Sequence, residues 1–384
     1  MRRTAAALGL AIALASACGK SEESAPKPST GEAAPAAPLA QPPAATPGRA
    51  GMIRPVVTAG GVTLAPGKKP VWFELGVACY VAAITMNGDA RPIDPIEQAR
   101  PGIAAALAAA GFDFDKDLLT IGMADCGSGL CLYFGVAMKD QAQMRTLVAG
   151  VGGAPPEEPE PGHFVMRLQG PAGPRAVHLR FLPVDWEGLA MPDDPRAREL
   201  RRASHVLFVS ADAAGAPVPD PFSLLAEPAA AQKRIGEIES LATDRRGRCA
   251  IGELPPVAAF RPGFDLTGGG FIAVTPPRVA EDQLAGLIGA SRSLDLEIRL
   301  DLSKTPTQAD LDGWVAQGRQ AFDAMASGTP APPALVALIR VILEKALAYR
   351  IGERHVVFSW HTSRVPKESL DAAEVELKKM MGSP

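Results

Sequence analysis

The sequence has few aromatic side chains and no long run of charge of one sign. Phe, Trp and Tyr make up 5% of its 384 residues, so a core must be built mainly from Leu, Val, Ile and Ala. Lys and Arg number 39 against 42 Asp and Glu, which gives a formal net charge of −3. Proteins that bind nucleic acids usually carry a basic patch or stripe. The composition therefore predicts no nucleic-acid partner.

Beyond its N-terminus the sequence also lacks any segment that is long and apolar enough to cross a membrane. It is rich in Gly (38) and Pro (37), which in a polar chain would indicate disorder. The hydrophobic fraction is 47%, however, and the charged fraction is 21%. These are ordinary globular values, so we expect most of the chain to fold.

Residues 1–17 have the features of an export signal. Arg2 and Arg3 precede an apolar run, residues 5–15, that is too short to span a bilayer. The run leads into the sequence LASAC, which ends at Cys18 and resembles the lipobox of bacterial lipoproteins. The resemblance implies cleavage after residue 17 and lipidation of Cys18. Gly19 after the cysteine implies sorting to the outer membrane by the same analogy.

Residues 18–51 are expected to act as an anchor and tether. They contain many Pro and Ala residues and almost no large apolar side chain, so they cannot bury enough surface to offset the entropy of ordering. Proline-rich chain favours the extended polyproline II conformation, at about 3.1 Å per residue. The segment would therefore hold a folded body away from the membrane surface.

The rest of the chain predicts an α+β fold with a largely antiparallel sheet. Residues 293–302 alternate apolar and polar side chains with a period of two, which indicates a strand with one solvated face. Residues 164–168 and 177–181 alternate in the same way around a Gly- and Pro-rich turn, which indicates a hairpin. Further strands are expected at 71–86, 118–126, 130–138, 204–210, 269–275 and 349–361.

Helical spacing of apolar residues occurs mainly in the C-terminal part. It predicts a helix over 307–325, a second from Pro332 to Leu347 and a third over 370–380. Ala-rich segments predict helices at 96–110, 139–149, 222–241 and 278–289. These helices would cover the faces of the sheet.

Two segments of the sequence resemble each other. Residues 131–150 and 271–289 both read as a strand, a short loop, the pair Asp-Gln and a helix. This similarity suggests that the chain has two halves with a similar order of elements, residues 52–255 and residues 256–384.

Four cysteines follow Cys18, and an exported chain meets an oxidising compartment, where an even number of cysteines favours disulfides. Cys126 and Cys131 flank a Gly-Ser-Gly turn between two apolar runs, so we expect a disulfide that closes a hairpin. Elimination then pairs Cys79 with Cys249. Zinc would need further ligands near each cysteine, and a redox motif would need C-x-x-C rather than the observed C-x4-C.

The most concentrated group of polar residues lies on one predicted strand. His355, Ser359 and His361 occupy the same face of the strand, opposite Phe358. Ser359 and His361 are close enough to interact, which leaves open a hydrolase with an unidentified acid. No G-x-S-x-G sequence exposes a serine nucleophile, and a solvated face of a sheet explains the same pattern.

Other motifs for chemistry are incomplete. Residues 113–117 place carboxylates at alternate positions, like the start of a calcium loop, but the Gly and Glu that such a loop requires are Leu118 and Ala124. We therefore expect no metal ion and no cofactor. The sequence predicts a non-enzymatic binding or structural protein of the bacterial envelope, attached to the membrane by its lipid. A protein partner or an apolar ligand, as in a lipid carrier, are the alternatives for what it binds.

The lipid anchor predicts the result of one substitution. Cys18→Ser removes the thiol that receives the lipid, so the protein should move from the membrane fraction to the soluble fraction of the envelope. Fractionation and immunoblotting measure this directly, with Cys131→Ser as a control that keeps the anchor. Retention of the Cys18→Ser variant in membranes would contradict the anchor.

Overall fold

The computed structural model describes two compact units of the chain. The described residues are 51–69, 72–76, 102–125, 130–152, 155–170, 173–211, 220–242, 247–274, 295–327, 344–361 and 364–366, with Cys79, Ile93, Glu97, Arg340, Glu368 and Val375 singly. The larger unit contains Gly48–Pro306 and Ile351–Ser363. The smaller unit contains described residues of Thr307–Arg350 and Arg364–Pro384.

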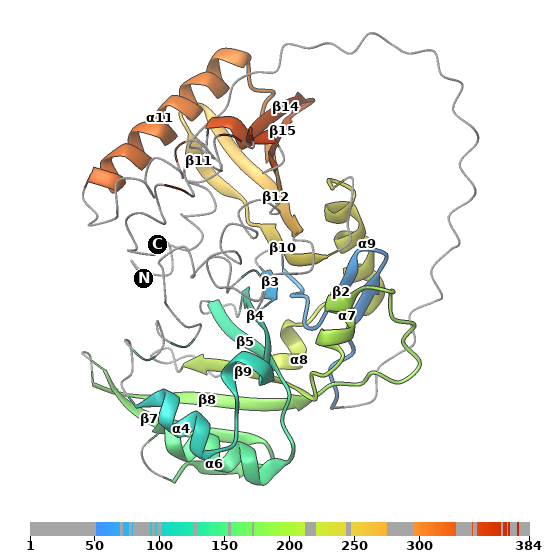
Figure 1. Ribbon diagram of the computed structural model, residues 1–384, viewed down its shortest axis with the longest axis vertical. Coiled ribbons are helices and arrows are strands. Elements are labelled where there is room, and N and C mark those ends of the chain that lie inside the picture. The colour runs from blue at the N-terminus through green and yellow to red at the C-terminus, as the bar shows by residue number, and fades with distance from the viewer. Residues whose placement is uncertain are drawn as a thin grey trace. The chain divides into compact units, whose positions relative to one another are not determined.

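The larger unit is built on one extended antiparallel sheet (Figure 1). Its strands lie in the order β15 (His355–His361), β13 (Asp295–Leu302), β12 (Phe264–Val274), β10 (Arg248–Leu254), β3 (Trp72–Gly76), β4 (Leu118–Asp125), β5 (Leu130–Val136), β9 (His205–Ala211), β8 (Gly173–Pro183), β7 (His163–Gly170) and β6 (Glu157–Glu160). β11 (Val257–Arg261) pairs with the start of β12, and β1 (Val56–Thr58) and β2 (Gly61–Thr63) form a separate hairpin. The predicted α+β class with a largely antiparallel sheet is thus confirmed.

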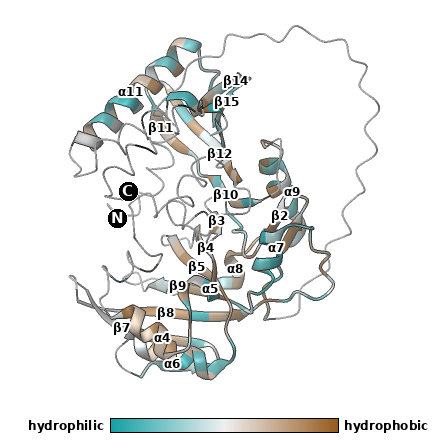
Figure 2. Cartoon of the chain, in the orientation of Figure 1, coloured by the Kyte–Doolittle hydropathy of each residue, from teal (hydrophilic) through white to brown (hydrophobic). Residues whose placement is uncertain are grey.

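Helices of the larger unit connect and cover these strands. They are α4 (Ile103–Ala109), α5 (Phe114–Asp117), α6 (Gln141–Gly152), α7 (Pro195–Leu200), α8 (Pro221–Leu224) and α9 (Pro228–Glu239). Asp194 begins α7 as an N-cap, because its carboxylate accepts a hydrogen bond from the N–H of Ala197 and Pro195 follows it. Helix α7 is largely hydrophilic in Figure 2, and Ala197 is its buried residue.

The smaller unit contains α11 (Gln308–Ser327) and the start of β14 (Leu347–Gly352). Thr307 begins α11, since its hydroxyl and N–H both bond the carboxylate of Asp310. The Tyr349 hydroxyl donates to Asp312 at 2.7 Å, which connects β14 to the N-terminal part of this helix.

Separate apolar clusters hold the helices on the sheet of the larger unit. Helix α9 packs through Ala231, Ile235 and Ile238 onto residues of the central strands that include Trp72 and Ile251. A second cluster joins α4 and α6 to β7 and β8, and Phe164 and Phe181 meet there edge to face. Helix α9 therefore covers the middle of the sheet, and α4 with α6 covers its β7–β8 end.

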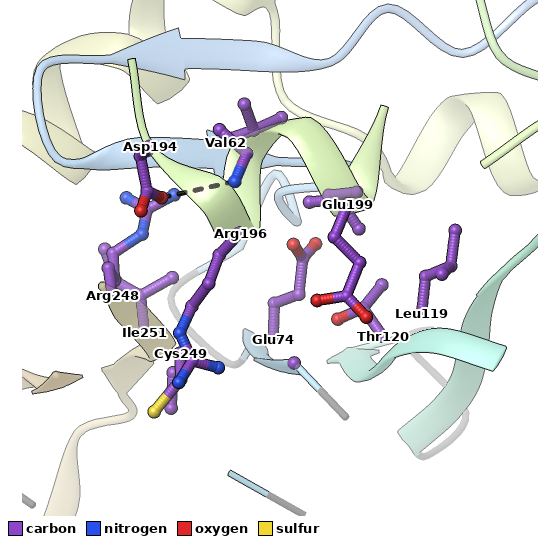
Figure 3. Close-up of a pocket in the computed structure, with 15 residues that line it drawn as sticks. Val62, Glu74, Leu119, Thr120, Asp194, Arg196, Glu199, Arg248, Cys249 and Ile251 are labelled. Atoms are coloured by element: carbon purple, nitrogen blue, oxygen red, sulfur yellow. Dashed lines mark hydrogen bonds between the residues drawn. The ribbon is translucent and has the colours of Figure 1, made fainter. Parts of the chain in front are cut away.

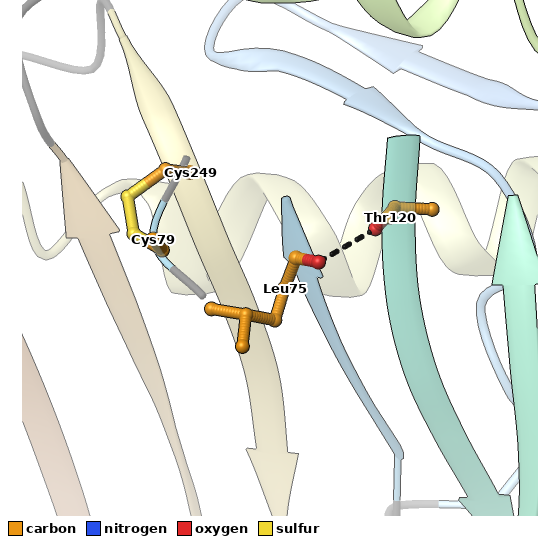
Figure 4. Close-up of a disulfide and its surroundings, with 4 residues drawn as sticks. All are labelled: Leu75, Cys79, Thr120 and Cys249. Carbon is orange, nitrogen blue, oxygen red and sulfur yellow. Dashed lines mark hydrogen bonds between the residues drawn. A yellow bond between two sulfur atoms is a disulfide. The ribbon is translucent and has the colours of Figure 1, made fainter. Parts of the chain in front are cut away.

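Strand β3 is the central strand, with β4 on one side and β10 on the other. Close to its end, Cys79 forms a disulfide with Cys249 at the start of β10, with the two Cα atoms 5.6 Å apart (Figure 4). The predicted Cys79–Cys249 pair is confirmed. On the other side, the hydroxyl of Thr120 on β4 donates to the carbonyl of Leu75 at 2.9 Å.

Gly122 allows the ring of the buried Tyr133 to lie across strand β4. Gly122 on β4 lies between Glu74 on β3 and Tyr133 on β5 in the register of the three strands. A Cβ atom at Gly122 would lie 1.9 Å from the Tyr133 ring. The ring therefore lies over Gly122, and its hydroxyl reaches the Glu74 carboxylate at 3.1 Å.

Several expected element boundaries were wrong. The strand expected over 71–86 ends at Gly76, and the strand expected over 349–361 is two strands, β14 and β15, joined by a turn. Arg354 in that turn has a positive φ of 54°, a conformation that regular strands exclude. The helix expected over 222–241 is divided into α8 and α9, because Pro228 begins a new helix. Strand β10, which occupies a central place in the sheet, was missed.

Some expectations lie outside the described residues. These are the helix at 278–289, most of the helices at 332–347 and 370–380, the signal, and the tether except for its last residue. The predicted division at residue 255 does not coincide with the division into units, since residue 255 lies between β10 and β11 inside the larger unit. The two similar halves stay a prediction.

The packing over Gly122 predicts a strong effect of a small substitution. Gly122→Ala places a methyl group inside the fully buried Tyr133 ring and displaces its hydroxyl from Glu74, so the free energy of unfolding should fall by about 2–4 kcal/mol. Gly236→Ala is the matched control, because a Cβ at Gly236 in α9 meets nothing within 4 Å. The control should gain up to about 1 kcal/mol from helix propensity. Urea unfolding measures both, and equal effects would contradict the packing argument.

Candidate functional site

Strands β13 and β15 bring together polar side chains that are far apart in the sequence. In the antiparallel register, His361 lies opposite Asp295, and Ser359 lies opposite Glu297. Paired residues of neighbouring strands point to the same face of a sheet. The polar face predicted for β15 is therefore continued by a row of charged residues on β13.

His361 is held between two carboxylates. Its Nε2 atom lies 2.6 Å from Glu297 Oε1, and its Nδ1 atom lies 3.3 Å from Asp295 Oδ1. Hydrogen bonds to Asp295 and then to Glu297 raise the pKa of His361 to about 9, against the opposing effect of partial burial. The imidazole is therefore a cation at neutral pH, and it provides the positive partner for Glu297, which is itself buried.

This geometry differs from that of a serine hydrolase. A general-base histidine must be neutral and must present one ring nitrogen to the serine while the other faces an acid. Both ring nitrogens of His361 face carboxylates, and its raised pKa keeps it protonated. The structure thus identifies acids near Ser359 and His361, but it arranges them as an ion pair rather than as a catalytic relay.

A groove with a volume of about 470 Å³ lies beside this polar row. Its lining comes from α9 and the residues after it, from the end of β10, and from β12 and β13. Ile238 of α9 packs against Gly270 of β12, where a Cβ would lie 2.9 Å from the Ile238 side chain. At Gly268 a Cβ would meet nothing within 4 Å, so the floor of the groove is open at that point.

The groove has charged groups of both signs and an apolar wall. Arg234 pairs with Glu253 at 3.3 Å, and Arg299 pairs with Asp301 at 2.7 Å. The apolar part of the lining consists of Ile238, Leu241, Leu254 and Pro256. Pockets of 300–1,000 Å³ with convergent polar groups are typical ligand sites. Sequence patterns did not indicate this groove, because its residues come from four separate segments.

A second polar group lies under the β1–β2 hairpin. Glu74 on β3 is buried, and its carboxyl group accepts hydrogen bonds from the N–H groups of Leu64 (2.9 Å) and Ala65 (3.4 Å) as well as from the Tyr133 hydroxyl. Burial raises its pKa to about 7, although these hydrogen bonds and the nearby charge of Arg248 act in the opposite direction. Burial and the neighbouring carboxylate raise the pKa of Tyr133 as well.

Close to Glu74, a second buried carboxylate belongs to Glu239 at the end of α9. It forms an ion pair with Arg248, and both side chains are almost fully buried. Glu239 also accepts hydrogen bonds from the Thr58 hydroxyl at 2.6 Å and from the N–H of Gly60 at 3.3 Å. Arg248 donates in turn to the Thr63 hydroxyl at 3.0 Å. Each charge in this group therefore has partners from the hairpin.

A small cavity of about 50 Å³ adjoins Glu74 (Figure 3). Figure 3 shows the Glu74 side chain below helix α7, near Thr120 of β4. Arg196 and Glu199 of α7 line the same cavity. This volume suits a water molecule rather than an organic ligand.

The structure describes some of the remaining cysteines and histidines. Cys131 is disulfide-bonded, but Cys126 and Cys18 lie outside the described residues, so the Cys126–Cys131 pair and the lipid site stay predictions. The Nε2 atom of His163 and the Nδ1 atom of His178, on neighbouring strands, are 3.0 Å apart. Burial, Arg180 and His178 lower the pKa of His163, and burial lowers the pKa of His205.

Within the part of the chain that the structure describes, no three His, Cys, Asp or Glu side chains are grouped to hold a metal ion. In the same part, none of the helices combines the length and the apolar character needed to cross a bilayer. Comparisons of the chain with protein-family models, with curated proteins and with solved structures found no match.

The environment of His361 predicts how stability depends on pH. Its folded pKa of about 9 lies above the ordinary value of 6.5. The ion pair therefore contributes its full stability below pH 6.5, and this contribution is lost as the pH rises through 9. The difference in free energy of unfolding between the wild type and His361→Gln should shrink over that range, as followed by urea titrations. His355→Gln on the same strand is the control, and an unchanged difference would contradict the pairing.

Proposed function

We propose that this chain is an exported, lipid-anchored protein of the bacterial cell envelope that binds a polypeptide partner and catalyses no reaction. The export signal of residues 1–17 and the lipobox-like cysteine at position 18 support the proposed location in the cell envelope. The Pro- and Ala-rich residues 18–51 support a tether that holds the body away from the membrane. The residue after Cys18 supports sorting of the protein to the outer membrane. The disulfide between Cys79 and Cys249 agrees with folding in an oxidising compartment.

The observation that carries the binding function is the groove between α9 and strands β12 and β13. It is the larger of the two hollows described above and has the volume of a ligand site. At Gly268, where a Cβ atom would meet nothing within 4 Å, its floor has no side chain. A ligand can therefore approach the backbone of β12 closely.

The chemistry of the groove favours an extended peptide. Its ion pairs, Arg234–Glu253 and Arg299–Asp301, present both signs of charge, so they favour a ligand that has both hydrogen-bond donors and acceptors. Its apolar wall, which includes Leu241 and Leu254, can cover one side of such a ligand. A peptide offers alternating N–H and C=O groups with side chains on both sides.

The two alternative functions are less well supported. An apolar-ligand carrier needs a continuous apolar cavity, but Arg234, Glu253, Arg299 and Asp301 all line the larger described hollow. A hydrolase with Ser359 needs a neutral histidine, but His361 is paired with two carboxylates.

We also propose that residues 52–255 and 256–384 share a common plan. In the first half, strand β5 leads through a short loop into helix α6, and in the second half strand β12 is followed by a similar sequence. After β5, Asp140 accepts a hydrogen bond from the N–H of Gln143 at 2.8 Å and so begins helix α6. The corresponding Asp282 follows β12, which supports a similar helix start there.

The groove can be tested by filling it. Ser240 lines the groove at the end of α9 and is exposed. End-blocked tetrapeptides should raise the melting temperature of the wild type, and Ser240→Trp should abolish the shift because the indole occupies the same space. Ser223→Trp is a matched control, because Ser223 is also exposed and its hydroxyl also bonds the carbonyl three residues earlier.

A further probe tests one of these alternatives in the same thermal assay. Palmitate represents the ligand of an apolar-ligand carrier. Stabilisation by palmitate without any effect of the tetrapeptides would contradict the peptide ligand. Equal stabilisation of Ser240→Trp and the wild type would contradict the groove as the site.

A further inference from the structure

Residues 53–67 form a strap across the sheet of the larger unit. At its start, the N–H of Ile53 donates to the carbonyl of Pro183 at 2.8 Å, and the Ile53 carbonyl accepts from Asp185 at 2.8 Å. At its end, Gly67 pairs with Leu225 in an isolated bridge. The β1–β2 hairpin lies between these two points and pairs only with itself.

Two buried carboxyl groups hold the middle of the strap. Glu239 accepts hydrogen bonds from Thr58 and Gly60 at the turn of the hairpin. Glu74 accepts them from Leu64 and Ala65, whose side chains are fully buried. Side chains from the sheet and from α9 therefore hold the strap, rather than a continuous ladder of backbone hydrogen bonds.

The charges below the strap balance in only one protonation state. Arg248 supplies one buried positive charge to Glu239 and Glu74. When Glu74 carries a proton, the group of three is neutral. When Glu74 is ionised, the group has one excess negative charge in a buried place, which is costly.

The hydrogen bonds around Glu74 fit both protonation states. The Tyr133 hydroxyl lies 3.1 Å from Glu74 Oε2 and 3.3 Å from the Phe73 carbonyl. It can donate to an ionised Glu74. It can also accept from a protonated Glu74 while it donates to Phe73. The protein can therefore take up a proton here without leaving a buried polar atom unpaired.

We propose that residues 53–67 are a pH-sensitive strap, which Glu74 holds on the sheet when it carries a proton and releases in part when it loses that proton. The raised pKa of Glu74, about 7, places this change near neutral pH. An open strap would expose Glu74 to water and return its pKa toward 4.5. Opening is therefore favoured progressively as the pH rises from 4.5 to 7, and it levels off above 7.

Other charged groups near Glu74 do not remove this imbalance. Asp194, Arg196 and Glu199 line the cavity beside it. They carry two negative charges and one positive charge, and Asp194 is already the cap of α7. The inference depends on neither the ligand groove nor the lipid anchor.

Hydrogen exchange at the strap tests this proposal on the full mature chain. After correction for the intrinsic exchange rate, the protection of the Leu64 and Ala65 amides should fall by about 10- to 100-fold between pH 5 and pH 8. Glu74→Gln keeps the shape and the hydrogen bonds without the charge, so its protection should be high and independent of pH. Glu199→Gln, which changes an exposed carboxylate of the same cavity, should behave as the wild type.

Two further observations make the test decisive. Amides of β7 and β8, far from Glu74, should keep their protection, which separates strap opening from global unfolding. The carboxyl carbon of Glu74 should titrate near pH 7 in the NMR spectrum of the wild type. A titration near 4.5, or the same pH dependence of exchange in Glu74→Gln, would overturn the proposal.

Discussion

The centre of the larger unit depends on the burial of two carboxyl groups, Glu74 and Glu239. A buried carboxyl group is tolerated only when each oxygen is hydrogen-bonded or neutralised. Residues 53–67 supply N–H and hydroxyl donors to the two carboxyl groups, and Arg248 of β10 supplies the charge. The hairpin, helix α9 and the central strands therefore depend on one another for their buried polar contacts, although they come from distant parts of the chain.

Glycines of the central strands and of the β1–β2 turn serve this arrangement. Gly122 leaves room for Tyr133 to reach Glu74, and a Cβ at Gly60 would lie 2.5 Å from the Glu239 carboxyl group. On the opposite face, Gly252 lies between Phe73 and Phe271, where a Cβ would be within 2.7 Å of each. The glycine content that suggested disorder in the sequence is here a condition of close packing. The cost in chain entropy is offset by the burial of large rings.

Patterns with a clear period were predictable, and contacts between distant segments were not. The alternation in residues 293–302 predicted β13, and the apolar runs around Cys126 and Cys131 predicted β4 and β5. Strand β10 was missed because Arg248, Cys249, Gly252 and Glu253 interrupt any apolar pattern, and each is explained only by a partner elsewhere in the fold. The polar face of His355, Ser359 and His361 was visible in the sequence. Its meaning depended on Asp295 and Glu297, whose register with β15 no local pattern specifies.

The position of the disulfide also affects how the chain can fold. Cys79 and Cys249 are 170 residues apart, and the ladder between β3 and β10 closes the same long loop. A chain synthesised from its N-terminus completes the β4–β5 and β7–β8 hairpins from local contacts, whereas β3 must wait for residues 248–254 to find its second neighbour. Contacts of such high sequence separation are slow to form. Until then the edge of β3 that will face β10 is open to pairing with another chain. The disulfide ends that period, because it makes the contact between β3 and β10 permanent.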